Sequence, residues 1–129
     1  EMEVATTLMN RGFPVSKPLT DNEPYDLVVE IDSELQKVQV KCMHKDEERN
    51  SLKTALYKSG EDFSQKRATY SPEEVDAFAF YYNGEIYWSW YSETPDSSIN
   101  LSLKDESEVL PRHEPRTRFA EDYKLDRKL

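Results

Sequence analysis

The sequence predicts a mixed α/β domain (α+β mixed) in which an N-terminal helix packs on a mixed, mainly antiparallel β-sheet. Two observations favour this fold class: apolar residues at helical spacing open the chain, and two patterns typical of β-hairpins follow. A length of 129 residues corresponds to one domain. We expect residues 1–109 to form its core and residues 110–129 to form a basic C-terminal tail of the same domain.

The predicted helix covers residues 1–11, and Gly12 follows it as a C-terminal stop signal. Its inward stripe is apolar and consists of Val4, Ala5, Leu8 and Met9. Residues 13–18 contain two prolines and therefore predict only a short or edge strand.

Two hairpins supply most of the predicted sheet. Residues 25–31 and 37–43 alternate in polarity, are rich in β-branched side chains and are joined by a short polar connection. Residues 75–82 and 86–91 flank Asn83-Gly84, the strongest short hairpin signal in the chain. Other short strands are expected at 52–57 and 99–103, and a charged loop at 44–51.

The formal net charge of −9 argues at first against DNA binding, because phosphate affinity comes largely from Lys and Arg. The charge is unevenly distributed, however. Residues 41–67 and 109–129 each carry +2, whereas residues 1–40 carry −5 and residues 68–108 carry −8. The acidic excess is typical of proteins from the high-salt cytoplasm of halophiles, including archaea, and equally of an ordinary surface kept acidic for solubility. The sequence leaves both explanations open.

No apolar run approaches 18 residues and no signal peptide precedes the first helix, so we expect no membrane contact. The single cysteine, Cys42, cannot form an internal disulfide, which fits a reducing cytoplasmic location. His44 and His113 are too few and too far apart for a zinc site.

The first hairpin gathers an acid, an amide and an amine on one face. If its turn is centred between residues 33 and 34, Asp26 lies opposite Lys41 and Val28 opposite Gln39. Because side chains alternate between faces, Asp26, Gln39 and Lys41 then share one face. The other face is apolar and consists of Leu27, Val29, Ile31, Val38, Val40 and Cys42.

Such a cluster suits phosphodiester hydrolysis. The Asp26 carboxylate and the backbone carbonyl of Val40 can hold Mg²⁺, which prefers oxygen ligands, and Lys41 can orient or deprotonate an attacking water. The alternative is an Asp–Lys ion pair on a solvated sheet face, which contributes little to stability. The same register predicts an ion pair of that kind between Glu30 and Lys37.

The spacing D-X(12)-(D/E/Q)-X-K resembles the signature of the PD-(D/E)XK nuclease superfamily. The likeness is strongest to group I intron-encoded homing endonucleases with a glutamine variant of the motif, and more distant to archaeal Holliday junction resolvases. Segments outside the motif add to the resemblance, namely Arg11-Gly12-Phe13, Asp21-Asn22, Tyr25-Asp26, Val75-Asp76-Ala77-Phe78 and Phe119-Ala120-Glu121-Asp122-Tyr123.

The resemblance implies a restriction-endonuclease-like core, Mg²⁺ (or Mn²⁺) as cofactor, and double-stranded or branched DNA as partner. It implies Asp26 as a metal ligand, Gln39 at the variable acid position, Lys41 as the catalytic lysine and Glu1 as an acid carried by the helix that reaches the metal. The helical pattern singles out Glu1 independently, because it shares the inward stripe with apolar residues three and seven positions later. The alternative is a solvent-facing first residue.

Two departures from the family pattern matter. Gln39 is a neutral amide where a carboxylate is usual, and Pro24 stands where relatives often carry a basic residue, with Glu23 before it. The function expected from the sequence is a metal-dependent DNA endonuclease. The alternatives are a weakly active or inactive nuclease-fold protein that binds DNA or a protein partner, and an acidic interaction domain without a nucleic-acid role.

Two cuts in a duplex require two active sites, so we expect a homodimer or a higher homo-oligomer. DNA contacts are expected from basic residues of the two positive blocks, with a solvated surface as the alternative for each. These residues are Lys53, Lys58, Lys66, Arg67, Arg112, Arg116 and Arg118.

Overall fold

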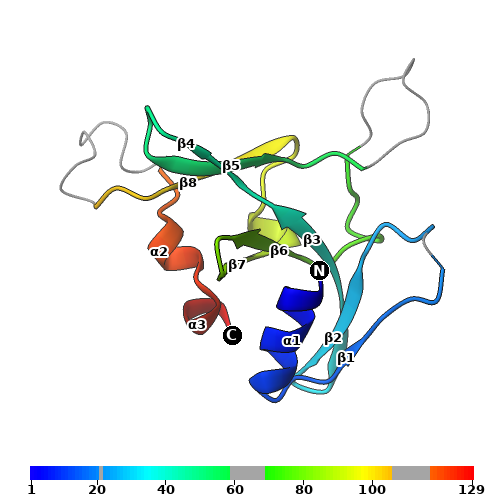
Figure 1. Ribbon diagram of the computed structural model, residues 1–129. Helices are drawn as coiled ribbons and strands as arrows, with labels where there is room; N and C mark the ends of the chain where they lie inside the picture. Colours follow the sequence, from blue (N-terminus) through cyan, green and yellow to red (C-terminus); the bar gives the residue numbers. More distant parts are fainter. Residues whose placement is uncertain (21, 59–68, 106–116) are drawn as a thin grey trace.

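The computed structural model describes residues 1–20, 22–58, 69–105 and 117–129, and Figure 1 shows the arrangement of its elements. The helices are α1 (Met2–Asn10), α2 (Ala120–Tyr123) and α3 (Leu125–Lys128), with a 3₁₀ turn at Tyr91–Glu93. The strands are β1 (Val15–Ser16), β2 (Leu27–Ile31), β3 (Glu34–Cys42), β4 (His44–Asp46), β5 (Ser51–Ala55), β6 (Ala77–Tyr82), β7 (Glu85–Trp90) and β8 (Ser98–Ser102).

Five strands form a mixed sheet in the order β1-β2-β3-β6-β7, and three strands form a second sheet in the order β4-β5-β8. In the larger sheet β3 and β6 run parallel, whereas all other neighbours are antiparallel. In Figure 1, α1 lies against the larger sheet and the chain passes from β3 into the smaller sheet through β4. The predicted fold class, a helix on a mixed and mainly antiparallel sheet, is confirmed.

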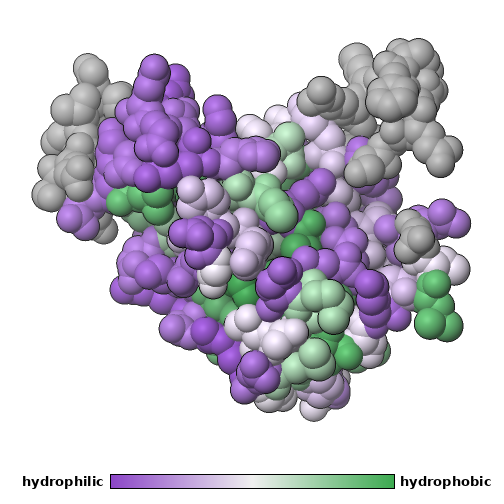
Figure 2. Space-filling model, in the orientation of Figure 1, coloured by the Kyte–Doolittle hydropathy of each residue, from purple (hydrophilic) through white to green (hydrophobic). Residues whose placement is uncertain are grey.

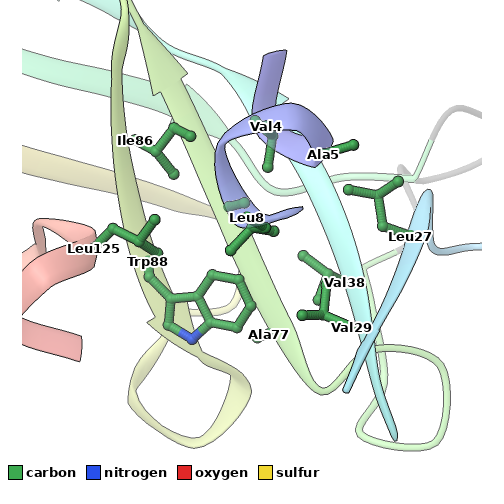
Figure 3. Close-up of a cluster of buried hydrophobic side chains, with 11 residues drawn as sticks. Val4, Ala5, Leu8, Leu27, Val29, Val38, Ala77, Ile86, Trp88 and Leu125 are labelled. Carbon is green, nitrogen blue, oxygen red and sulfur yellow. The ribbon is translucent and has the colours of Figure 1, made fainter. Parts of the chain in front are cut away.

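The first helix forms where its apolar stripe predicts it. Val4, Ala5 and Leu8 are buried, and Figure 3 shows them turned toward side chains of β2, β3 and β7. Met9, which was also expected on the inward stripe, is instead 49% exposed. Gly12 ends the helix with a φ of 92°, and the N–H of Phe13 donates to the Leu8 carbonyl at 3.1 Å. This closure turns the chain back toward β1 at the edge of the sheet.

The register of the first hairpin differs from the predicted one by two residues. Leu27 pairs with Val38 and Ile31 with Glu34, so the turn consists of Asp32-Ser33. Both turn residues have positive φ, 52° and 69°, as a two-residue hairpin turn requires. Short polar side chains tolerate this conformation better than Glu34 would, which is why the turn lies one residue earlier than predicted.

A shift of two residues keeps each side chain on its predicted face, because the side-chain period of a strand is two. The pairing changes nonetheless. Glu30 faces Leu35 instead of Lys37, and the Lys37 amine donates to the Glu73 carbonyl, so the predicted Glu30–Lys37 pair is wrong. On the apolar face Leu27, Val29 and Val38 are buried, as expected, whereas Cys42 at the end of β3 is exposed.

The charged segment after β3 is partly a strand rather than a loop. β4 pairs with β5 in the register His44 with Lys53 and Asp46 with Ser51. Its side chains carry no apolar alternation, so pairing with β5 decides its conformation and local propensity does not. Figure 2 shows hydrophilic side chains over this part of the surface.

Buried side chains form two clusters, one on each face of the β6–β7 hairpin. The cluster under α1 consists of Val4, Ala5, Leu8, Leu27, Val29, Val38, Ala77, Ala79, Ile86, Trp88 and Leu125 (Figure 3). The second consists of Met43, Leu52, Leu56, Tyr70, Val75, Phe78, Phe80, Tyr87, Ile99, Leu101 and Ala120. The described part of the predicted tail thus packs on the core through α2 and α3.

Candidate active site

Asp26 lies immediately before β2 and extends the pairing of β2 with β3 through its side chain. Its backbone N–H donates to the Val38 carbonyl at 2.9 Å, and its Oδ2 accepts the N–H of Val40 at 3.1 Å. β3 continues beyond the start of β2. There the Asp26 carboxylate, and not a backbone carbonyl, accepts the N–H of Val40. This is the end of the hairpin at which the sequence placed the acid.

The backbone carbonyl of Val40 points to the same side of β3 as its N–H, because both groups of one strand residue face the same neighbour. The Asp26 carboxylate therefore lies beside that carbonyl, past the end of β2. Gln39 Nε2 donates to the Val40 oxygen at 3.4 Å. Because the nitrogen of the amide faces this carbonyl, its oxygen is the end left to face a ligand.

Lys41 is half-buried on the same face as Asp26. Its Nζ donates to the Tyr57 carbonyl at 2.9 Å and lies 5.2 Å from the centroid of the Tyr70 ring. The structure therefore brings Asp26, Gln39 and Lys41 together on one face, although the shifted register places Asp26 opposite Gln39 instead of Lys41.

Burial shifts the acid and the amine of this site in opposite directions. Desolvation raises the pKa of Asp26, the Val40 N–H and the Lys41 amine oppose the shift, and the nearby Glu1 carboxylate adds to it. Desolvation lowers the pKa of Lys41, with Asp26 opposing. Both shifts disfavour the charged forms, as expected for groups held in place before a ligand neutralises them.

Glu1 reaches the site from the start of α1. Together with Asp26 it lines an open pocket of about 240 Å³, which the chain between β1 and β2 closes from the other side. Its Oε1 forms an ion pair with Lys17 Nζ at 2.8 Å. Figure 1 shows the N-terminus close to β3. Glu1 is thus the N-cap of α1 and not part of the helix, and it is exposed. It still lines the same pocket as Asp26, with a lysine as its partner.

The residues present fit a hard divalent cation. The available donors are all oxygens, namely the Asp26 and Glu1 carboxylates, the Val40 carbonyl and the Gln39 amide. Burial, with a smaller contribution from the Glu1 carboxylate, raises the pKa of Asp26, and a bound cation would favour the ionised form. Within the described residues, no group of three or more His, Cys, Asp or Glu side chains is placed to hold a metal ion.

The predicted DNA contacts are only partly within the described residues. Lys53 lies 3.7 Å from an Asp46 carboxylate oxygen, and Lys58 lies 2.8 Å from one of Glu74. The Arg118 carbonyl accepts the Ser102 N–H at 2.7 Å. The remaining four predicted contacts, Lys66, Arg67, Arg112 and Arg116, lie outside the described residues.

Three groups at the site were missed in the sequence: Lys17 beside Glu1, and the Tyr57 carbonyl and Tyr70 ring beside Lys41. All three come from connections between strands. In such segments the sequence has no periodic pattern that predicts which residue lies near the hairpin. No signal in the sequence could have identified them.

The profile of the PD-(D/E)XK endonuclease family matches residues 1–126 of the sequence. The chain belongs to the PD-(D/E)XK endonuclease family. No protein with a curated description matches it. Among solved structures, a bacterial homing endonuclease, I-Ssp6803I, matches with a TM-score of 0.72 and 24% sequence identity, covering 91% of this chain and 82% of that one.

The match to I-Ssp6803I shows that the two proteins share a fold, and the family profile supports nuclease function for this PD-(D/E)XK protein. The resemblance inferred from the hairpin motif is therefore confirmed. None of the helices in the described ranges combines the length and apolarity needed to cross a membrane.

Proposed function

We propose that this protein is a DNA endonuclease that hydrolyses phosphodiester bonds with the aid of Mg²⁺ or Mn²⁺. The supporting observation is the convergence of Asp26, the Val40 carbonyl and Lys41 where β3 extends beyond β2. The alternative is a solvated Asp–Lys ion pair. In such a pair, burial would not raise the pKa of the acid and lower the pKa of the amine.

Asp26 and the Val40 carbonyl would hold the cation, with Gln39 at the variable acid position and Glu1 completing the site from α1. When bound, the cation neutralises charge that develops on the scissile phosphate and acidifies a water. Asp26 is half-buried and tied to the Val40 N–H, so its carboxylate is held in one orientation before the ligand arrives. Pre-organisation of this kind lowers the cost of assembling the transition state.

Lys41 would orient the attacking water and accept its proton at Nζ. A lysine with an ordinary pKa is almost fully protonated at neutral pH and cannot accept a proton. Burial lowers the pKa of Lys41, and a divalent cation at Asp26 would lower it further by charge repulsion. The side chain is therefore placed and tuned for a role as general base.

DNA in double-stranded or branched form is the proposed substrate. Its backbone would approach the pocket of Asp26 and Glu1 from the basic segments that contain Lys53, Lys58 and Arg118. A duplex offers two strands to one site per chain, so we propose a homodimer or higher homo-oligomer for double-strand cleavage. The lone Cys42 supports a location in the reducing cytoplasm.

The test is incubation of the protein with supercoiled plasmid, linear duplexes of random sequence and four-way junctions. Each reaction contains Mg²⁺, Mn²⁺ or EDTA, at low and at multimolar salt. Cleavage that needs the metal and is lost in Lys41→Ala supports the proposal. Lys45→Ala is the matched control, because Lys45 is a neighbouring lysine of β4 that pairs with Glu47. Absence of metal-dependent cleavage under every condition contradicts catalysis.

A second function is favoured by Gln39, whose neutral amide attracts a cation less strongly than a carboxylate would. We therefore also consider a nuclease fold that binds DNA or a protein partner with weak or no cleavage. Gln39→Glu separates the two cases. A gain in Mn²⁺ affinity together with a gain in cleavage indicates a functional scaffold, whereas salt-dependent DNA binding without cleavage in either form indicates a binding protein.

A further inference from the structure

The amine of Lys41 is enclosed by two groups that come from the connection between β5 and β6. Nζ donates to the Tyr57 carbonyl at 2.9 Å and lies 5.2 Å from the centroid of the Tyr70 ring. The Tyr70 hydroxyl donates to the same carbonyl at 3.5 Å. A single backbone oxygen thus connects the amine and the phenol.

The Tyr57 carbonyl is held in place by the backbone on both sides. The Leu56 N–H donates to the Ser97 carbonyl at 2.9 Å, and Tyr57 forms an antiparallel bridge with Thr69. Two chain segments therefore converge at Tyr57, and the position of its oxygen does not depend on a flexible side chain.

Tyr70 is itself rigidly packed. It is 8% exposed, and its ring meets that of Phe78 edge to face at 5.3 Å between centroids. The hydroxyl of Tyr91 donates to the Tyr70 carbonyl at 3.2 Å. One residue further on, the Ser71 N–H donates to Glu74, which also pairs with Lys58 at 2.8 Å. Phe78 of β6 thus holds the ring of Tyr70, and the 3₁₀ turn after β7 and the adjoining backbone hold its main chain.

We propose that Tyr70 is a positioning residue of the endonuclease site, which holds the Lys41 amine against the Tyr57 carbonyl and so fixes its place on the face that it shares with Asp26. The inference rests on the proposed function and adds a group that the hairpin motif does not contain. A lysine side chain has four flexible carbons, and its freedom would otherwise have to be lost in the transition state.

The ring face and the Tyr57 carbonyl both attract N–H groups of the amine, whether it is neutral or protonated, so two contacts restrict Nζ. Displacement of a catalytic group by about 1 Å reduces rates by as much as about 100-fold. Loss of the ring should therefore affect the chemical step far more than DNA affinity.

The experiment compares Tyr70→Leu, which removes the ring, with Tyr70→Phe, which keeps the ring and removes the hydroxyl. Tyr87→Leu is the matched control, because Tyr87 is a buried tyrosine of the same cluster at 5% exposure and does not contact Lys41. NMR of the full chain records the ring-current shift of the Lys41 ε-methylene and its NOE to the Tyr70 ring. This readout requires neither DNA nor metal, and the wild-type protein alone can show the NOE.

The second readout is single-turnover cleavage of a DNA that the wild type cleaves with Mg²⁺, beside the Kd for the same DNA with Ca²⁺. We expect Tyr70→Leu to lose the ring-current shift and to slow cleavage about 10- to 100-fold at an unchanged Kd. Tyr70→Phe should keep the shift and stay within about threefold of the wild-type rate, because the ring face provides the contact. Tyr87→Leu should change neither.

Absence of the NOE in wild type overturns the positioning role, even if Tyr70→Leu does not fold. Equal losses in the Leu variants of Tyr70 and Tyr87 also overturn it, because they would show a general effect of core damage. If the wild type cleaves no DNA, the proposed endonuclease function fails, while the NMR readout still decides whether Tyr70 holds Lys41.

Discussion

β2–β3 and β6–β7 are both antiparallel hairpins with a two-residue turn, yet they bury different surfaces. β6 and β7 bury both faces, with alanines and Trp88 toward α1 and aromatic side chains toward the smaller sheet. β2–β3 buries one face and leaves Asp26, Gln39 and Lys41 on the other. The first type of hairpin supports the domain. The second combines a buried face, which fixes its register, with a polar face that is free to hold a ligand.

The largest effect is expected when a buried side chain of the β6–β7 hairpin is truncated. Trp88 is fully buried, so Trp88→Ala should lower the free energy of unfolding by about 3–5 kcal/mol. Within the described part of the chain, its indole nitrogen has no hydrogen-bond partner. Trp88→Phe should therefore cost clearly less, because it also removes a buried donor that is not satisfied.

Urea denaturation followed by circular dichroism measures both variants of Trp88. Gln39→Ala, on the polar face of the other hairpin, should cost less than about 1 kcal/mol in the same assay. Similar losses for Trp88→Ala and Gln39→Ala would show that the two hairpins are not specialised in this way.

The two hairpins pair directly through β3 and β6. Tyr70 joins them a second time, because it contacts Phe78 of one and Lys41 of the other. Burial, with smaller contributions from Asp26 and Glu74, raises the pKa of Tyr70 to about 12. The native state then holds this proton more tightly than the unfolded chain does. Stability from Tyr70 is present below pH 10 and is lost as the pH rises through about 12, by about 2 kcal/mol in all.

Denaturation of wild type and Tyr70→Phe at pH 9 and near pH 12 isolates this contribution, since Tyr70→Phe cannot lose the proton and the other tyrosines are common to both. We expect the free energy of unfolding of Tyr70→Phe to rise relative to that of wild type at the higher pH. An unchanged difference would show that Tyr70 is solvated in the native state.

Asp26→Asn, on the polar face of the first hairpin, should raise the free energy of unfolding instead of lowering it. Burial raises the pKa of Asp26, so its ionised form destabilises the fold, and wild-type stability falls as the pH rises above the ordinary value of 3.8 through the raised one. The amide keeps an oxygen for the Val40 N–H. We expect about 0.5–1 kcal/mol more stability at pH 7 and a smaller difference at pH 4.

Mg²⁺ should raise the melting temperature of wild type more than that of Asp26→Asn, because the variant loses one of the two carboxylates proposed for the cation site. Thermal unfolding with Mg²⁺, and with EDTA as the control, measures this. If Asp26→Asn is less stable than wild type at pH 7, the Asp26 carboxylate stabilises the fold and the prediction is wrong.

The smallest effects are expected at the two turns. Gly84 has a φ of 85° and no atom within 4 Å of the place of an added Cβ, so Gly84→Ala should cost only conformational energy, about 1 kcal/mol. Ser33 has a φ of 69°, so Ser33→Gly relieves strain and should be neutral or stabilising by up to about 0.5 kcal/mol. Urea denaturation compares them, and changes of equal sign would contradict the turn assignment.

The sequence alone determined much of the fold and the centre of the candidate site. The apolar stripe fixed α1, Asn83-Gly84 fixed the second hairpin, and the motif on the first hairpin indicated the family. These features depend on period and on turn chemistry, which are local. For the same reason the error of two residues in the first register did no harm, since the face of each side chain depends only on parity.

Only the tertiary structure decided which groups surround that centre. The parallel pairing of β3 with β6, the strand at His44–Asp46 and the places of Lys17, Tyr57 and Tyr70 all depend on contacts between segments far apart in the sequence. Such contacts form because burial of both faces of β6–β7 brings the connections to the edge of the site. A single sequence encodes that burial through composition and does not show where each connecting residue comes to lie.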